Sequence, residues 1–160
     1  MQLLFYLLLY TAGGGFYDLT LRTPDGNTLH LSDYKGKKVL IVNLASASRW
    51  ASQLDHLEEL QRRYDSNLVV IGIPSNSFGN EPLDNTGISQ WNSDQHVNFP
   101  VAEKSVVSGA TQIALYQWLQ YPVIGDYQKY LVDEQGTLIG FFSSDTDPLN
   151  YVVTNAVIGN

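Results

Sequence analysis

The stretch Lys37–Tyr64, KKVLIVNLASASRWASQLDHLEELQRRY, decides the fold of this chain. It opens with Val39-Leu40-Ile41-Val42, a short run rich in β-branched residues, which is typical of a strand buried on both faces. Further on, apolar residues recur at intervals of three and four, which predicts one face of an amphipathic helix. These residues are Leu54, Leu57, Leu60 and Tyr64. Ser48 lies between the two patterns, where we expect the helix to start. Because helix N-termini present unpaired N–H groups, we expect any functional site near Ser48.

Working outward, the flanking patterns predict a mixed α/β domain. The predicted strands are 16–23 and 28–32, which form a hairpin, then 67–73, and then a second hairpin from 127–132 and 137–142. The predicted helices after the central one are 86–93, 113–120 and 149–158. Strands joined by a helical crossover pair in parallel, whereas the late hairpin adds antiparallel strands. We therefore predict a thioredoxin-like sandwich: a central mixed sheet flanked by helices, preceded by an N-terminal β-hairpin.

Composition limits the function classes. With 160 residues and 44% apolar content, the chain is long enough for one globular domain, which we place at 16–160 behind an extension at 1–15. The net charge of −7 argues against binding nucleic acid or anionic membranes through bulk electrostatics. The absence of cysteine excludes disulfides, thiol catalysis and thiolate metal sites, and it leaves the compartment unidentified.

The extension contains an apolar run, Leu3–Tyr10, that has several interpretations. Its eight residues are far fewer than the roughly 20 that a membrane span needs. It lacks the basic region of a secretory signal, although Thr11-Ala12-Gly13 resembles a weak cleavage site. We expect an extra strand or a segment packed on the domain or on a partner; a signal or anchor remnant is the alternative. Membrane association is expected only if this segment docks there. The predicted contact residues are Leu3, Leu4, Phe5, Tyr6 and Tyr10.

The central stretch also resembles a known family. Asn43-Leu44-Ala45-Ser46-Ala47-Ser48, followed by Gln53, Leu57 and Leu60, is similar to the active-site segment of the glutathione peroxidases. The resemblance covers about Phe16 to Pro148 and implies the same thioredoxin-like fold. Other segments that carry it are Phe16–Leu19, Leu31–Lys37, Pro74–Pro82, Phe99–Lys104, Leu115–Leu119 and Lys129–Asp133.

The resemblance implies four catalytic groups, and all four differ here. The family's cysteine or selenocysteine nucleophile corresponds to Ser48, and its glutamine to Ser77. The family's tryptophan and asparagine correspond to Gly125 and Asp126. These positions are therefore predicted to be vestigial, with no catalytic residue, cofactor or metal expected.

The replacement of the family's nucleophile by serine matters because of how peroxide is reduced. Peroxide reduction needs a thiolate or selenolate that is oxidised and then reduced again by a thiol. A serine hydroxyl does not ionise appreciably near neutrality, and a helix dipole worth ~1 kcal/mol does not change that. The resemblance places Ser75 and Ser105 where family members often have further cysteines. The chain therefore has no second thiol at these positions either.

Other chemistries find little support in the sequence. A serine nucleophile needs a base, and His56 lies two helical turns beyond Ser48 without a surrounding nucleophile elbow. We expect Ser48 to cap the helix instead. Asp94 and His96 lack further metal-ligand spacing, and Asp145 and Asp147 are predicted to cap the last helix.

Trp50 is predicted to be exposed beside Ser48 and is a candidate contact residue, with retained pocket architecture as the alternative. The sequence thus favours a catalytically inactive glutathione-peroxidase-like module that contacts a protein partner, as an accessory subunit of a larger assembly. The alternative is a peroxidase-family enzyme with residual or altered glutathione- or thioredoxin-dependent activity.

Overall fold

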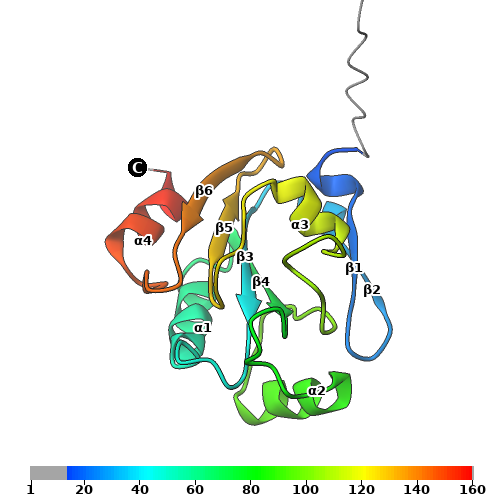
Figure 1. The fold of residues 1–160 in the computed structure, drawn as a ribbon. Helices are drawn as coiled ribbons and strands as arrows, with labels where there is room; N and C mark the ends of the chain where they lie inside the picture. The colour runs from blue at the N-terminus through cyan, green and yellow to red at the C-terminus, as the bar shows by residue number, and fades with distance from the viewer. Residues whose placement is uncertain (1–13, 160) are drawn as a thin grey trace, which may run out of the picture.

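The computed structural model describes residues 14–159, which form an α/β domain (Figure 1). Residues 1–13 of the predicted extension therefore lie outside the described residues, and so do the contact residues predicted within them. The strands are β1 Thr20–Arg22, β2 Thr28–His30, β3 Lys38–Leu44, β4 Leu68–Pro74, β5 Lys129–Val132 and β6 Leu138–Phe142. The helices are α1 Gln53–Arg63, α2 Asn85–Asp94, α3 Ala114–Leu119 and α4 Tyr151–Ile158, with short 3₁₀ segments η1 Phe16–Asp18 and η2 Leu31–Tyr34.

The central sheet has the order β4-β3-β5-β6, and β1 and β2 form a separate hairpin. β3 and β4 are parallel, with Ile41 opposite Ile71, because α1 carries the chain back across the sheet between them. β5 lies antiparallel to β3, and β6 antiparallel to β5. This mixed sheet with its N-terminal hairpin confirms the predicted thioredoxin-like fold.

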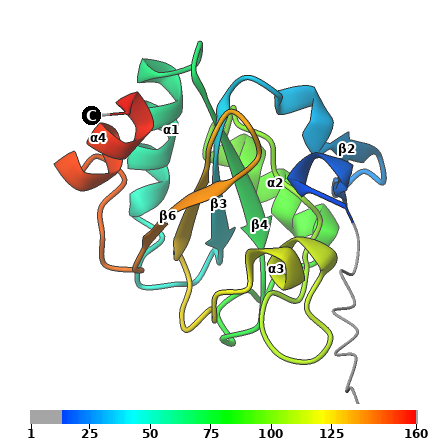
Figure 2. The same ribbon diagram turned by 90° about the horizontal axis from the view of Figure 1, so that it is seen from above.

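β3 is buried along its whole length, as its β-branched run predicts. Its side chains alternate between two cores, with Val39 and Ile41 on one side of the sheet and Leu40 and Val42 on the other. The first core is covered by the hairpin and α3, and the second by α1 and α4 (Figure 2). In α1, Leu54, Leu57 and Leu60 are buried as predicted, and Tyr64 packs at the helix end. Burial on both faces is what fixes β3 at the centre of the sheet.

Several element boundaries correct the expectations from sequence. Residues 16–18 form a 3₁₀ turn instead of the start of a strand, because the Phe16 side chain is buried and the Tyr17 hydroxyl donates to the Glu134 carbonyl at 2.8 Å. The last helix begins at Tyr151 and not at 149, and Val152 in its first turn is 40% exposed. α3 covers only Ala114–Leu119 of the predicted 113–120, and it meets the core through Leu115, Tyr116 and Leu119.

Between residues 14 and 159, no helix combines the length and the apolar character that crossing a membrane requires.

Candidate functional site

Three loops meet at one edge of the sheet and form the candidate site. β3 and β4 are parallel neighbours, so the segments after Leu44 and after Pro74 leave the sheet at the same edge. β5 runs the other way, and the segment before it therefore arrives there too. The Tyr127 N–H donates to the Asn43 carbonyl at 2.7 Å, which fixes this third segment against the end of β3.

Ser48 is buried in the first loop, where the backbone engages its hydroxyl. Its side chain is 7% exposed, and its Oγ accepts a hydrogen bond from the Trp50 N–H at 3.2 Å. The expectation that Ser48 caps α1 is wrong, because the helix begins only at Gln53. The residues between Ser48 and Gln53 form turns; in one of them the Ala51 N–H donates to the Ser48 carbonyl at 3.0 Å. The hydroxyl caps a turn that precedes the helix.

Asp126 belongs to the same site and is joined to the Ser48 loop through Asn80. The Asn80 Nδ2 donates to Asp126 Oδ2 at 2.7 Å, and the Ala47 N–H donates to the Asn80 carbonyl at 3.0 Å. Asp126 is 4% exposed, and its Oδ1 has no hydrogen-bond partner within the described structure. The structure thus brings a buried carboxyl group to the loop that holds Ser48.

Gly125, next to Asp126, fits a space that leaves little room for a side chain. Its carbonyl accepts from Asn43 Nδ2 at 2.9 Å. A Cβ built on Gly125 would lie 2.9 Å from Ser144 Oγ, so any larger residue there requires Ser144 to shift. The Ser144 carbonyl is itself held by Gln53 Nε2 at 2.7 Å. The surroundings of Gly125 are therefore adapted to the absence of a side chain.

The hydroxyl of Ser77 makes its hydrogen bonds outside this group. Its Oγ accepts from the Ser75 hydroxyl at 2.9 Å and from the Val107 N–H at 3.1 Å. Ser75 is fully buried, whereas the Ser105 hydroxyl donates to the Glu103 carbonyl at 2.8 Å. Ser77 and Ser105 both line a surface hollow of about 380 Å³, together with Lys104. Of the four predicted positions, the contacts thus join Ser48 to Gly125 and Asp126, and direct Ser77 to this hollow.

Glu81 is a site residue that the sequence interpretation missed. It is 1% exposed, and its carboxylate accepts from the Ser46 N–H at 2.8 Å, the Ser46 hydroxyl at 2.7 Å and the Leu83 N–H at 3.2 Å. These donors satisfy a buried charge and tie the loop after β3 to the loop after β4. An acidic residue immediately before Pro82 in an otherwise polar loop was the available signal.

Two buried titratable side chains lie at the start of β5. Lys129 is fully buried, and its Nζ donates to the Tyr127 carbonyl at 2.6 Å and the Ser143 carbonyl at 3.4 Å. Burial lowers the pKa of Lys129 to about 8, partly offset by the nearby Asp147 and Asp145. Burial raises the pKa of Tyr127, and so do the acidic groups Glu81 and Asp126. No sequence signal indicates these shifts, because β5 has an ordinary strand pattern.

Trp50 is half-buried, which corrects the prediction that it is exposed. Its ring packs against the core under α1, and the Arg49 guanidinium lies 4.7 Å from the ring centroid. The turns that precede α1 fold Trp50 inward, so its free area is smaller than its loop position suggests. Its role as a contact residue stays a prediction.

The predicted capping of the last helix by Asp145 and Asp147 is also wrong. Asn150 is the cap: its Oδ1 accepts from the Val152 N–H at 3.0 Å. Asp147 instead pairs with His56 Nδ1 at 2.6 Å and accepts from the Leu149 N–H. Pro148 separates these residues from the helix start, so the cap falls two residues after it. Within residues 14–159, no three His, Asp or Glu side chains are grouped as a metal site requires.

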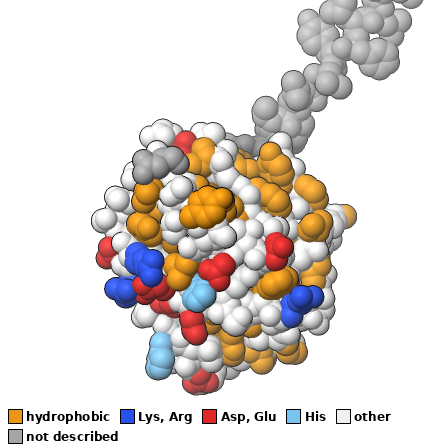
Figure 3. Space-filling view, turned by 90° about the vertical axis from the view of Figure 1, so that its left-hand side faces the viewer, with side chains coloured by type: hydrophobic (Ala, Val, Ile, Leu, Met, Phe, Trp, Pro, Cys, Tyr) orange, Lys and Arg blue, Asp and Glu red, His pale blue; other side chains and the backbone are white. Residues whose placement is uncertain are grey.

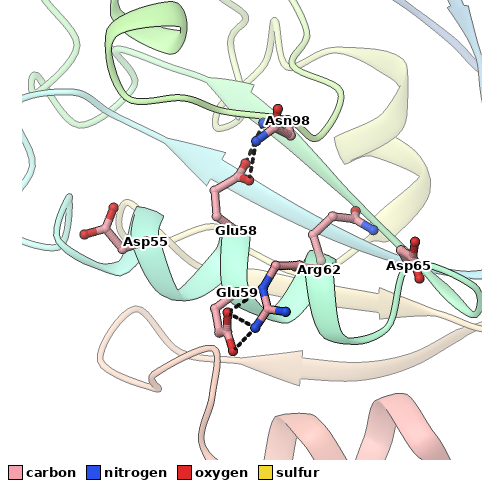
Figure 4. A pocket seen from close by; sticks show the side chains of 7 residues that line it. Asp55, Glu58, Glu59, Arg62, Asp65 and Asn98 are labelled. Atoms are coloured by element: carbon pink, nitrogen blue, oxygen red, sulfur yellow. Dashed lines mark hydrogen bonds and ion pairs between the residues drawn. The ribbon is translucent and has the colours of Figure 1, made fainter.

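A second hollow, of about 430 Å³, lies along α1 away from these loops (Figure 4). Most of the residues that line it are acidic, but two of these, Glu58 and Glu59, already accept hydrogen bonds from neighbouring side chains or backbone. Glu58 accepts from Asn98, and Glu59 from Arg62 and Arg63. We assign no site to this hollow.

The fold and the loop arrangement define a thioredoxin-like protein, and comparison with known proteins narrows the class. The glutathione peroxidase family model matches residues 16–120. The chain belongs to the glutathione peroxidase family.

Among relatives, the glutathione peroxidase-like peroxiredoxin gpx1 of Schizosaccharomyces pombe is 38% identical over 144 residues, covering 83% of this chain and 91% of the relative. The glutathione peroxidase of Lactococcus lactis is 34% identical, with 83% and 92% covered. Among solved structures, Trgpx in its apo form superposes with a TM-score of 0.71 at 29% identity, covering 92% of this chain and 95% of that one. A thiol:disulfide interchange protein from Chlorobium tepidum gives a TM-score of 0.69 at 16% identity, with 87% and 92% covered, which shows the fold alone.

Proposed function

We propose that this protein is a non-catalytic member of the glutathione peroxidase family that serves as an interaction module. One observation carries the proposal: the chain contains no cysteine, and the position that resembles the family's redox residue is Ser48. The Ser48 hydroxyl is buried and bound by the Trp50 N–H. An alcohol there has no reversible oxidation step comparable to that of a thiolate.

The rest of the site supports the same proposal. The positions that resemble the family's glutamine, tryptophan and asparagine are Ser77, Gly125 and Asp126. The hydroxyl of Ser77 bonds to other groups, Ser144 occupies the space beside Gly125, and Asp126 brings a buried carboxyl group. None of these arrangements supplies a neutral donor set for a developing thiolate or oxyanion. In this proposal the retained fold binds a partner protein, and the chain is an accessory subunit of a larger assembly.

The second candidate is a peroxidase-family enzyme with residual or altered activity. The names of the relatives favour it, since they are glutathione peroxidases and glutathione peroxidase-like peroxiredoxins. Such an activity would have to reduce hydroperoxides without a thiol of this chain, with glutathione or thioredoxin as the reductant.

A peroxide-consumption assay separates the two candidates. The purified chain is incubated with hydrogen peroxide or an organic hydroperoxide and with either glutathione or a thioredoxin system. We expect peroxide to be consumed at the same rate as in buffer without the chain. Turnover that scales with the concentration of the chain and is lost on heating would overturn the non-catalytic proposal.

Native mass spectrometry of the protein purified from its source tests the interaction half of the proposal. We expect a mass larger than that of one chain, with a second polypeptide released on denaturation. A clean monomer of 17.9 kDa would contradict the accessory-subunit role.

A further inference from the structure

The surface hollow beside Ser77 is lined by groups that donate hydrogen bonds. Its volume of about 380 Å³ is within the range of pockets that take small molecules. The Ser105 N–H donates to the Pro74 carbonyl at 2.8 Å, which holds the segment 104–109 against the loop after β4. Both segments line the hollow, which we call the Lys104 hollow. The loop after β4 contributes Asn76 and Ser77, and the other segment contributes Lys104, Ser105, Val106 and Ser108.

The Ser77 hydroxyl has a proton to donate in this hollow. Its Oγ accepts hydrogen bonds from the Ser75 hydroxyl at 2.9 Å and from the Val107 N–H at 3.1 Å. These two bonds use both acceptor positions of the oxygen, so the proton of the hydroxyl is left for a third partner. Because Ser77 is exposed where it lines the hollow, that partner comes from solvent or from a ligand.

Asn76 and Lys104 are fixed by the protein in the same way. Asn76 Oδ1 accepts from the Glu81 N–H at 3.0 Å, which leaves the two Nδ2 protons as donors. Lys104 Nζ donates to the Leu83 carbonyl at 2.8 Å, and the Lys104 N–H donates to Asn85 Oδ1 at 2.8 Å. An ammonium group has three protons, so two remain for a ligand. Side chains that are already held in place lose little freedom on binding.

The charge around the hollow favours an anion. Of the described residues that line it, Lys104 alone is charged, although the chain has 16 acidic residues and 9 lysines and arginines. The carboxylate of Glu103, the preceding residue, faces Arg22 at 3.9 Å, and its carbonyl accepts from the Ser105 hydroxyl at 2.8 Å. On the side of the molecule where α4 lies, by contrast, acidic side chains lie beside Lys, Arg or His (Figure 3). The Lys104 hollow thus combines a positive charge with neutral donors and no carboxylate.

We propose that the Lys104 hollow binds the oxyanion group of a small ligand, a carboxylate or a phosphate, through Asn76, Ser77 and Lys104. The oxygens of such a group accept hydrogen bonds from several donors at once, and bonds to an ionised acceptor are roughly twice as strong as neutral ones. Val106, which is 42% exposed, gives the hollow an apolar wall for a short apolar part of the ligand. The proposal does not depend on whether the chain is catalytic.

Titrations of the full chain followed by ¹H–¹⁵N NMR test the proposal. The probes are inorganic phosphate and butanoate, each added at constant ionic strength with chloride as the balancing anion. We expect saturable shifts confined to 76–78 and 104–109, with a Kd in the low millimolar range for at least one probe. Binding of both probes indicates a general oxyanion site, and binding of one identifies its class; both results support the proposal. Shifts that do not saturate with either probe, or that spread evenly over the surface, would overturn it.

Two variants and a matched control test the donors. Lys104→Met removes the ammonium group, and Asn76→Asp keeps the oxygen that accepts from the Glu81 N–H but adds a negative charge. Each should weaken binding of the probe about tenfold or more. Lys37→Met is the control, because Lys37 Nζ also donates to a backbone carbonyl, that of Asp65 at 2.7 Å. It removes the same charge elsewhere and should change the affinity less than about twofold. Equal losses in the two lysine variants, or unchanged binding in Lys104→Met and Asn76→Asp, would overturn the proposal.

Discussion

Ser48 is held by the backbone on both of its sides, and the groups around it are poorly suited to a thiolate. Its N–H donates to the Ala45 carbonyl, and its Oγ accepts from Trp50. Two buried carboxyl groups bond to the same loop: Ser46 donates directly to Glu81, and Ala47 is linked through Asn80 to Asp126. A negative charge beside a cysteine disfavours ionisation of the thiol.

We therefore predict that Ser48→Cys does not restore a peroxidase. The pKa of the new thiol is expected to be raised by the nearby carboxyl group, and its oxidation by peroxide should be slow and nearly stoichiometric. Stopped-flow kinetics with Ser89→Cys, on the exposed face of α2, as a surface-thiol control measures the difference. A rate for Ser48→Cys far above that control would show that the pocket still activates a thiol.

Full restoration needs the other positions as well. Adding Ser77→Gln, Gly125→Trp and Asp126→Asn should accelerate the Ser48→Cys reaction. The structure adds one requirement to this set: Ser144 lies 2.9 Å from a Cβ at Gly125, so Ser144→Gly should improve the folding of any variant that carries Gly125→Trp. Thermal unfolding of the variants with and without Ser144→Gly checks this requirement.

Lys129 gives the protein a distinctive pH dependence. Burial lowers its pKa from 10.5 to about 8, so the unfolded chain binds more protons than the folded one between these pH values. Stability therefore rises with pH in this window, and the cost of the buried charge is fully present below pH 8. We predict a gain of about 2 kcal/mol in the free energy of unfolding between pH 8 and pH 10.

Denaturant titrations at several pH values measure this gain. Lys129→Met, which keeps the side chain's length without its charge, should remove the gain. Above pH 10 the curve should turn down, because the pKa of Tyr127 and Tyr116 is raised by burial and the unfolded state then loses protons first. A flat profile from pH 8 to 10 in the unmodified chain would show that Lys129 is not buried in charged form at neutral pH.

At the scale of elements, β3 and the loop of Glu81 illustrate what could and could not be predicted from the sequence. β3 was predictable because its four consecutive apolar residues, Val39 to Val42, leave a local pattern, and α1 because its leucines recur at helical spacing. The start of α1 could not be predicted. The turns from Ser48 to Ser52 are stabilised by i to i+3 hydrogen bonds between backbone groups, and these do not require particular side chains. The role of Glu81 depends on a partner 35 residues away.

The Glu81 carboxylate links two loops, and we predict that it is a main stabiliser of the site. Glu81→Ala leaves the Ser46 N–H, the Ser46 hydroxyl and the Leu83 N–H without their acceptor. The expected loss in the free energy of unfolding is about 2–4 kcal/mol, since unsatisfied buried donors cost about 1–3 kcal/mol each before relaxation. Glu103→Ala, at a surface pair with Arg22 whose atoms are 3.9 Å apart, is the control and should change stability by less than about 0.5 kcal/mol. Similar losses in both variants would contradict the assignment.

At the scale of the whole molecule, an acidic surface and exposed apolar side chains act in opposite directions. The net charge of −7 keeps copies apart, whereas the exposed side chains of Tyr121, Ile139 and Phe141 favour association. Sequence reasoning identified Leu3–Tyr10 as an unusual apolar segment but could not choose between a partner and the domain itself. Local patterns do not encode which distant surface an apolar segment contacts.

Deleting residues 2–12 tests whether the apolar extension contacts a partner protein. Because we propose an interaction module, the melting temperature of the truncated chain should stay within about 2 °C of that of the full chain, since about 1 kcal/mol corresponds to roughly 2–4 °C in a domain of this size. The second polypeptide that co-purifies with the full chain should be lost. Ile158→Lys in the full chain, at a residue of α4 that is 49% exposed, is the control and should retain the second polypeptide. If the deletion instead lowers the melting temperature by several degrees, the segment packs on the core of this domain and not on a partner.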